Sequence, residues 1–88
     1  MRILVIEDSI RLADTIADAL EAESYLVDSV YDGQSGYDNA ASDIYDIVIL
    51  DIMLPKMNGY EVLSKLRENG HMYRSLSYQP KQNLRIKF

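Results

Sequence analysis

Three acidic residues stand at the ends of two apolar runs. Glu7 and Asp8 directly follow the run 3–6, and Asp51 follows the run 47–50. Short apolar runs of this kind are typical of strands buried on both faces of a parallel sheet, and the carboxyl ends of such strands meet at one edge. The three carboxylates are therefore expected to converge. Crowded carboxylates need a cation, oxygen ligands suit Mg²⁺, and Asp51 could then attack a phosphoryl group.

Each acidic position also has a simpler interpretation. An acid between a strand and a helix often caps the helix or offsets the positive end of its dipole, which would explain Glu7 and Asp8 without a ligand. Asp51 taken alone could be a solvated acid where a strand ends. The joint pattern favours a site, because both positions fall on the same edge of strands that should be adjacent.

The elements that must position these acids can be read along residues 1–70. Strand patterns cover residues 3–6, 25–31 and 46–50, and helical patterns cover the residues from Ser9 to Leu20, residues 33–42, and a segment around Val62, Leu63 and Leu66 that ends at Asn69 and Gly70. Ser9 or Asp8 is the expected N-cap of the first helix. The order β-α-β-α-β-α predicts an α/β fold with a parallel, doubly wound sheet of the flavodoxin-like kind.

Composition limits the class of protein. Eighty-eight residues suffice for one small domain, and the absence of cysteine excludes a disulfide framework and a thiolate metal site. No apolar run approaches the roughly 20 residues that span a bilayer, so a cytoplasmic protein without membrane contact is expected.

The charge is unevenly distributed along the chain. Residues 1–70 hold all fourteen acids and five basic residues and carry −9, whereas residues 71–88 carry +4. The acidic part is a poor match for nucleic acid, so we expect no direct nucleic-acid binding.

Residues 1–70 resemble the receiver domain of bacterial two-component response regulators. The resemblance rests on the stretches Ile-Leu-Val-Ile-Glu-Asp at residues 3–8 and Ile-Val-Ile-Leu-Asp-Ile-Met-Leu-Pro-Lys-Met-Asn-Gly at residues 47–59. The second stretch is the more specific of the two. Relatives of this kind usually carry a DNA-binding output domain that controls transcription, and no such domain is visible in this sequence.

The resemblance implies roles for six residues. Asp51 would accept the phosphoryl group, and Glu7 and Asp8 would hold Mg²⁺ directly or through water. The backbone carbonyl of Met53 would be a further metal ligand, and Pro55 and Gly59 would shape the loop above the site. Gly59 could adopt a backbone conformation that other residues resist. The phosphoryl donor would be a phosphohistidine on a sensor histidine kinase.

The sequence also departs from this family. A receiver has five β-α units and this chain matches about three, so the fold is expected to be incomplete. We find neither the switch Ser or Thr after the fourth strand nor the Lys after the fifth: Thr15 lies on the first helix, and Lys81 and Lys87 lie in a segment without a matching pattern. His71 is expected to be an exposed loop residue without a neighbouring acid. Residues 71–88 are interpreted as a tail foreign to the family, arising from a frameshift, a truncation or cloning.

An incomplete sheet would leave the third strand as an exposed, hydrophobic edge. Such edges recruit partners, so a homodimer or a swapped oligomer through this strand is expected, and residues 84–88, which alternate like a strand, could add to the edge. Dimerisation or swapping could thereby complete the fold.

Three functions compete at this point. The first is a signalling phospho-acceptor, and the alternative is a phosphorylation-incompetent fragment that acts only through binding or oligomerisation. A phosphatase of the haloacid-dehalogenase type would need a second Asp two residues after the nucleophile, where this chain has Met53, so an enzyme is not expected. A structural α/β fragment without metal also stays open.

Overall fold

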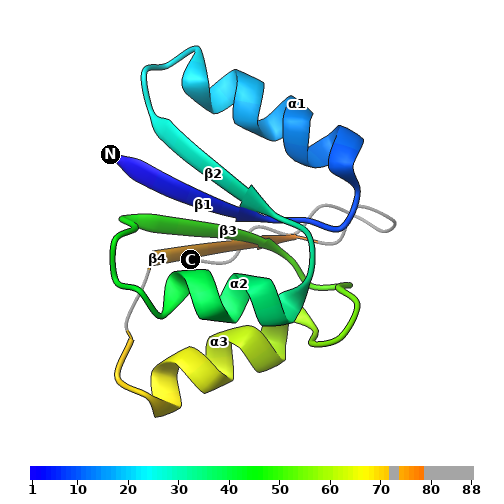
Figure 1. The fold of residues 1–88 in the computed structure, drawn as a ribbon, viewed down its shortest axis with the longest axis vertical. Coiled ribbons are helices and arrows are strands. Elements are labelled where there is room, and N and C mark those ends of the chain that lie inside the picture. Colours follow the sequence, from blue (N-terminus) through cyan, green and yellow to red (C-terminus); the bar gives the residue numbers. More distant parts are fainter. Residues whose placement is uncertain (72–73, 79–88) are drawn as a thin grey trace.

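The two apolar runs form the centre of a parallel sheet. The computed structural model describes residues 1–71 and 74–78 of the chain. Within these residues the elements follow in the order β1 (Arg2–Ile6), α1 (Ile10–Glu21), β2 (Leu26–Val30), α2 (Gly33–Ala40), β3 (Ile47–Asp51), α3 (Gly59–Glu68) and β4 (Arg74–Tyr78) (Figure 1). The predicted α/β fold with three β-α units is confirmed.

The sheet of the described residues has the strand order β2-β1-β3-β4, with every neighbouring pair parallel. The chain runs from β1 outward to β2 and then crosses back over β1 to β3. The order therefore reverses between β1 and β3, which is the position where doubly wound sheets bind ligands.

The expectation of an exposed third strand is wrong. β4 pairs with β3 along its whole length, from Ile47 opposite Arg74 to Asp51 opposite Tyr78. β3 is therefore an inner strand, and a dimer through its edge would have to displace β4. The alternating segment 84–88, predicted to be a strand, lies outside the described residues.

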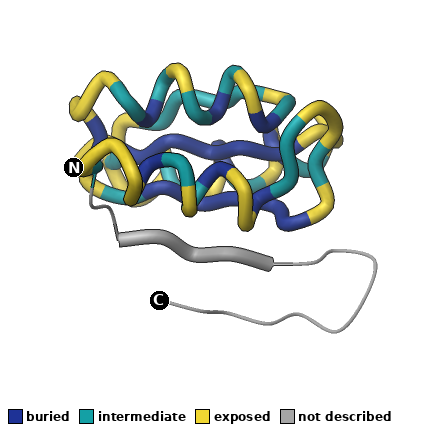
Figure 2. The backbone as a smooth tube through the Cα atoms, turned by 90° about the horizontal axis from the view of Figure 1, so that it is seen from below, coloured by how far each residue is buried: buried dark blue, intermediate teal, exposed yellow. Residues whose placement is uncertain are grey.

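Helices cover both faces of the sheet (Figure 1). On one face, Ile3, Val5 and Ile49 pack with Ala13 of α1. On the other face, the strands pack against α2 and α3 through a larger cluster made of Leu4, Ile6, Ala40, Tyr45, Val48, Leu50, Val62 and Leu66. Figure 2 shows the buried strands between helices whose outer turns are exposed. The alternation of side chains along a strand explains why neighbours such as Val5 and Ile6 belong to different clusters.

Each helix begins at a polar cap. Ser9, Asp32 and Asn58 accept backbone N–H groups three residues ahead through their side-chain oxygens. These bonds satisfy donors that the first turn leaves without a partner in the helix. The caps therefore fix the residue at which each loop ends and the following helix begins.

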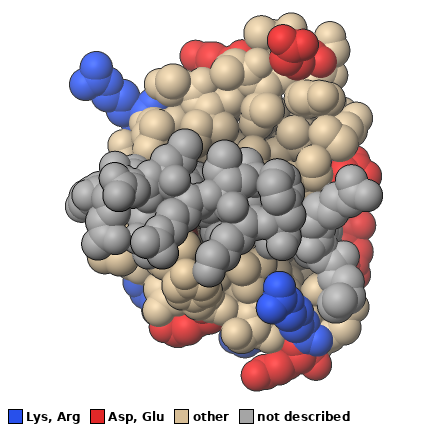
Figure 3. Space-filling model, turned by 180° about the vertical axis from the view of Figure 1, so that it is seen from behind, with Lys and Arg blue, Asp and Glu red and all other residues tan. Residues whose placement is uncertain are grey.

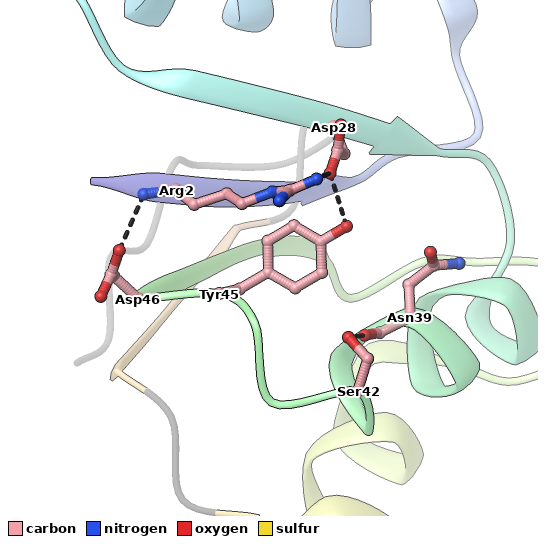
Figure 4. Close-up of polar contacts among 6 residues, drawn as sticks. All are labelled: Arg2, Asp28, Asn39, Ser42, Tyr45 and Asp46. Atoms are coloured by element: carbon pink, nitrogen blue, oxygen red, sulfur yellow. Dashed lines mark hydrogen bonds and ion pairs between the residues drawn. The ribbon is translucent and has the colours of Figure 1, made fainter.

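A polar network ties the strands together near the amino ends of β1 and β3 (Figure 4). The Tyr45 hydroxyl donates to Oδ2 of Asp28 at 2.7 Å, and the Arg2 guanidinium donates to the same oxygen at 3.1 Å. The backbone N–H of Arg2 donates to Asp46 at 2.8 Å. The hydrogen bond from Tyr45 and the charge of Arg2 hold the pKa of Asp28 below its usual value, so the network favours the ionised carboxyl.

The prediction for His71 is wrong. Its Nδ1 lies 2.8 Å from Oδ1 of Asp43, and its side chain is only 19% exposed. The two residues are 28 positions apart in the sequence, so the partner could not be seen in the local pattern. Their contact ties the end of α3 to the loop before β3.

The surface is rich in acid. Figure 3 shows acidic side chains around the rim of the face that it presents, as expected for a chain with 14 Asp and Glu against 9 Lys and Arg. Among the described residues, no helix has the length and apolar character needed to cross a membrane.

Candidate functional site

The carboxyl ends of β1 and β3 bring three acids together. The parallel register pairs Ile6 with Leu50, so the next residues along the chain, Glu7 after β1 and Asp51 at the end of β3, lie side by side. One ligand oxygen from each of Glu7, Asp8 and Asp51 lies within 4.8 Å of the others. The predicted convergence of the three carboxylates is confirmed.

Two of the three acids are buried. Glu7 is 1% exposed and Asp51 is 3% exposed, whereas Asp8 is exposed to solvent. Burial of two acids beside each other is costly unless hydrogen bonds or a cation compensate it. The site is thus buried at its base and open at the Asp8 side.

Backbone N–H groups orient the two buried carboxylates. Ser9 donates to Oε2 of Glu7 at 2.8 Å, and Met53 donates to Oδ1 of Asp51 at 2.9 Å. The cap of α1 is Ser9, whose hydroxyl accepts from Leu12 at 3.3 Å. Neither Glu7 nor Asp8 is therefore the capping residue, and the capping interpretation of this acidic pair does not hold.

The carboxyl of Asp51 is harder to ionise than that of an ordinary aspartate. Burial raises the pKa of this carboxyl, and the charge of Asp8 raises it further. Hydrogen bonds from the Met53 N–H and with Glu7 oppose the effect without cancelling it, so the pKa stays above its usual value. A cation bound among the three carboxylates would remove the cause of the repulsion.

The donor set fits Mg²⁺. This ion prefers oxygen ligands at an octahedral site and usually keeps several waters. Three carboxylates offer the oxygens, and the exposed side at Asp8 leaves room for water. Soft metals are a poor fit, because the cluster holds neither a thiolate nor an imidazole.

The loop between β3 and α3 carries the other predicted site residues. Met53 and Pro55 are exposed, and Gly59 is buried at the first turn of α3. Gly59 lets the start of α3 pack closely against the end of β3, since a Cβ there would lie 2.8 Å from the carbonyl oxygen of Asp51. The expectation of an unusual backbone conformation at Gly59 is wrong. The left-handed residue of this loop is Lys56, with φ of 68°.

The site has a neighbour that the sequence did not reveal. The register of β4 places Tyr78 opposite Asp51 and Ser77 opposite Leu50. β4 therefore ends beside the acidic cluster.

Comparison with known proteins decides the family. The sequence model described as "Response regulator receiver domain" matches residues 3–77, most of the chain. The chain belongs to this family. The match extends past Gly70, beyond the two stretches of resemblance at residues 3–8 and 47–59, and includes most of β4. Receiver domains are signalling domains of response regulators rather than enzymes, and this one carries the acidic cluster described above.

Curated relatives of this receiver domain include the response regulator ArlR of Staphylococcus aureus. Its sequences from strains Mu50 and NCTC 8325 are 48% identical over 67 residues, which cover 76% of this chain. The same alignment covers 31% of the relatives. The chain therefore spans about a third of the length of the curated relatives it matches.

Solved structures give the same fold. The receiver domain of the Francisella response regulator 1452 superposes with a TM-score of 0.85 at 22% identity, over 89% of this chain and 64% of that chain. TrrA from Thermotoga maritima, solved in complex with Mg²⁺-BeF, has a TM-score of 0.76 at 29% identity, over 89% and 66%. A complex of the histidine kinase ThkA with TrrA gives a TM-score of 0.83 at 28% identity, over 99% and 75%.

Proposed function

We propose that this receiver domain accepts a phosphoryl group on Asp51 from a phosphohistidine of a sensor histidine kinase. The observation that carries the proposal is the convergence of Glu7, Asp8 and Asp51 at the point where the strand order reverses. The complexes of TrrA with Mg²⁺-BeF and with a histidine kinase support it, because TrrA shares this fold.

Glu7, Asp8 and Asp51 would hold Mg²⁺, together with the backbone carbonyl of Met53. When bound, the ion supplies positive charge that offsets the charge of the carboxylates and of the phosphoryl oxygens. Buried Glu7 and Asp51 provide fixed ligands, and exposed Asp8 provides a ligand at the side open to solvent.

Asp51 acts as the nucleophile. One of its carboxylate oxygens bonds to phosphorus while the P–N bond of the phosphohistidine breaks, and the electron pair of that bond stays on the imidazole nitrogen. The Met53 N–H fixes the plane of the carboxylate by holding Oδ1 at 2.9 Å.

A transfer assay with a small phosphodonor tests the proposal. Acetyl phosphate with Mg²⁺ should label the wild type, and chelation of Mg²⁺ or the substitution Asp51→Asn should abolish the label. Asp18→Asn, an exposed acid on α1, is the matched control and should be labelled like the wild type. An acid-stable label, or a label that persists in Asp51→Asn, would sink the assignment.

The alternative is a receiver domain that binds partners without accepting a phosphoryl group. Binding of Mg²⁺ at the acidic cluster would not be enough for transfer, since loss of a preorganised charge that stabilises the phosphoryl group costs several kcal/mol in the transition state. A chain that binds Mg²⁺ but is not labelled would support this alternative.

We also propose that the receiver domain controls transcription through an output domain, because the matched relatives are about three times longer than this chain.

A further inference from the structure

The loop between β3 and α3 rests on the first turn of α2. The backbone N–H of Gly33 donates to the carbonyl oxygen of Pro55 at 3.3 Å. The Lys56 ammonium lies 3.7 Å from Oδ2 of Asp32, the cap of α2. Lys56 is 71% exposed, so this ion pair is a weak contact. The backbone contact at Gly33 is the closer attachment.

Gly33 leaves no room for a side chain. A Cβ at this position would lie 1.7 Å from the carbonyl oxygen of Met57, 2.6 Å from its carbonyl carbon and 2.7 Å from its Cβ. Two of these atoms belong to the backbone, so they cannot swing aside as a flexible side chain would. Any larger residue at position 33 therefore requires the loop and α2 to move apart.

The same loop holds the acidic cluster in place. Met53 donates its N–H to Asp51, and Gly59 donates its N–H to the carbonyl oxygen of Ile52 at 3.0 Å. These bonds tie both ends of the loop to the carboxyl end of β3. If Met57 moves, the other residues of the short segment 52–58 must move as well, and these include Met53.

We propose that Gly33 is a positioning residue of the Asp51 site. Because it has no side chain, the loop can close on α2 and hold the Met53 backbone at the distance that orients Asp51 for metal binding and phosphoryl transfer. The inference rests on the proposed function, and it adds α2, an element that supplies no ligand, to the parts that shape the site. Asp32 and Lys56 assist without being required.

Gly33→Ala tests the inference, with Gly36→Ala as the matched control. Gly36 lies on the same helix, but the three atoms nearest to its Cβ would all belong to the side chain of Ile6, at 2.6–3.0 Å, rather than to the loop backbone. Both variants are expected to lower the melting temperature. We expect Gly33→Ala alone to raise the Kd for Mg²⁺ by about tenfold or more, since loss of a group that orients metal ligands typically costs about 10- to 100-fold in metal affinity. An NMR titration of ¹⁵N-labelled protein gives the Kd, and the Met53 amide resonance reports the loop without metal.

A second pair of variants guards against a Gly33→Ala chain that does not fold. Lys56 has φ of 68°, which glycine accepts and a β-branched residue resists. Lys56→Val should therefore shift the Met53 amide and weaken Mg²⁺ binding, whereas Lys56→Gly, which also loses the ion pair with Asp32, should bind Mg²⁺ like the wild type.

The outcomes separate the two proposals. If the wild type binds no Mg²⁺, the proposed function fails and the role of Gly33 fails with it. If the wild type binds Mg²⁺ and Gly33→Ala binds it equally well, only the positioning role is overturned. Equal loss of affinity in Gly33→Ala and Gly36→Ala would also overturn it, because the loss would then follow from stability alone.

Discussion

Asp8→Asn should stabilise the metal-free chain and should gain less stability from Mg²⁺ than the wild type does. The substitution keeps the size of the side chain and removes one of three negative charges whose oxygens lie within 4.8 Å of one another. Two unit charges at that distance repel by about 3.5 kcal/mol at an effective dielectric constant of about 20 and by about 0.9 kcal/mol in bulk water. Because Asp8 is exposed, we expect a gain of about 1–2 kcal/mol in the free energy of unfolding.

Urea denaturation followed by far-UV circular dichroism at pH 7 measures this gain, first in the presence of a chelator at low ionic strength. Salt should reduce it, since the screening length falls to about 10 Å at 0.1 M. Saturating Mg²⁺ should then stabilise the wild type by about 2.7 kcal/mol when the ion is at 100 times its Kd. The variant should gain less, because it has lost a ligand.

Asp18→Asn serves as the control for net charge. It removes one negative charge from the exposed face of α1 and should change the stability little, with or without Mg²⁺. The reasoning fails if Asp8→Asn destabilises the metal-free chain, or if Asp18→Asn stabilises it as much. In either case the three carboxylates would not repel one another as their geometry requires.

Three further predictions concern the frame of the site. Tyr45→Phe removes the hydroxyl that donates to Asp28 and should cost about 1 kcal/mol at pH 7, because Asp28 is 44% exposed. A contact that lowers the pKa of a carboxyl in the folded state stabilises the fold above the unfolded pKa, and this stabilisation is lost as the pH falls through the folded pKa. The stability difference between wild type and Tyr45→Phe, measured by urea denaturation, should therefore shrink in acid. A larger difference in acid would contradict this. Gly59→Ala should lower the free energy of unfolding by about 1–3 kcal/mol, because its Cβ would press on the backbone of Asp51 and Ile52, and an unchanged melting temperature would contradict this. Asn58→Ala removes the cap of α3, which accepts the Glu61 N–H at 3.0 Å, and should cost about 1 kcal/mol in thermal unfolding, whereas Asn58→Asp should keep most of the stability.

The sequence predicted the parts of this fold that depend on local pattern. Apolar runs located β1 and β3 because strands buried on both faces need apolar residues at every position. The acids that follow those runs then fell at one edge of the sheet, because a parallel arrangement fixes which ends meet. The positions of Glu7, Asp8 and Asp51 in the sequence therefore predict that they lie together.

The sequence could not predict contacts made between distant segments. β4 has no strong apolar pattern, so its pairing with β3 is visible only in the folded chain. The partner of His71 is an aspartate in another loop, and Gly59 is required by the neighbouring backbone rather than by its own φ angle. In the same way, the contact between Gly33 and Met57 exists only once α2 and the β3–α3 loop are folded.

The polar network of Arg2, Asp28 and Tyr45 has a consequence for how the domain opens. Attractive contacts gather near the amino ends of β1 and β3, while the crowded carboxylates lie at their carboxyl ends. Local unfolding should therefore begin at the carboxyl end in the metal-free chain, so that amide hydrogens around Asp51 exchange with solvent sooner than those around Arg2. An ion bound at the acidic cluster would protect the end of the sheet that otherwise opens first. Slower amide exchange around Asp51 would therefore report that the metal site is occupied.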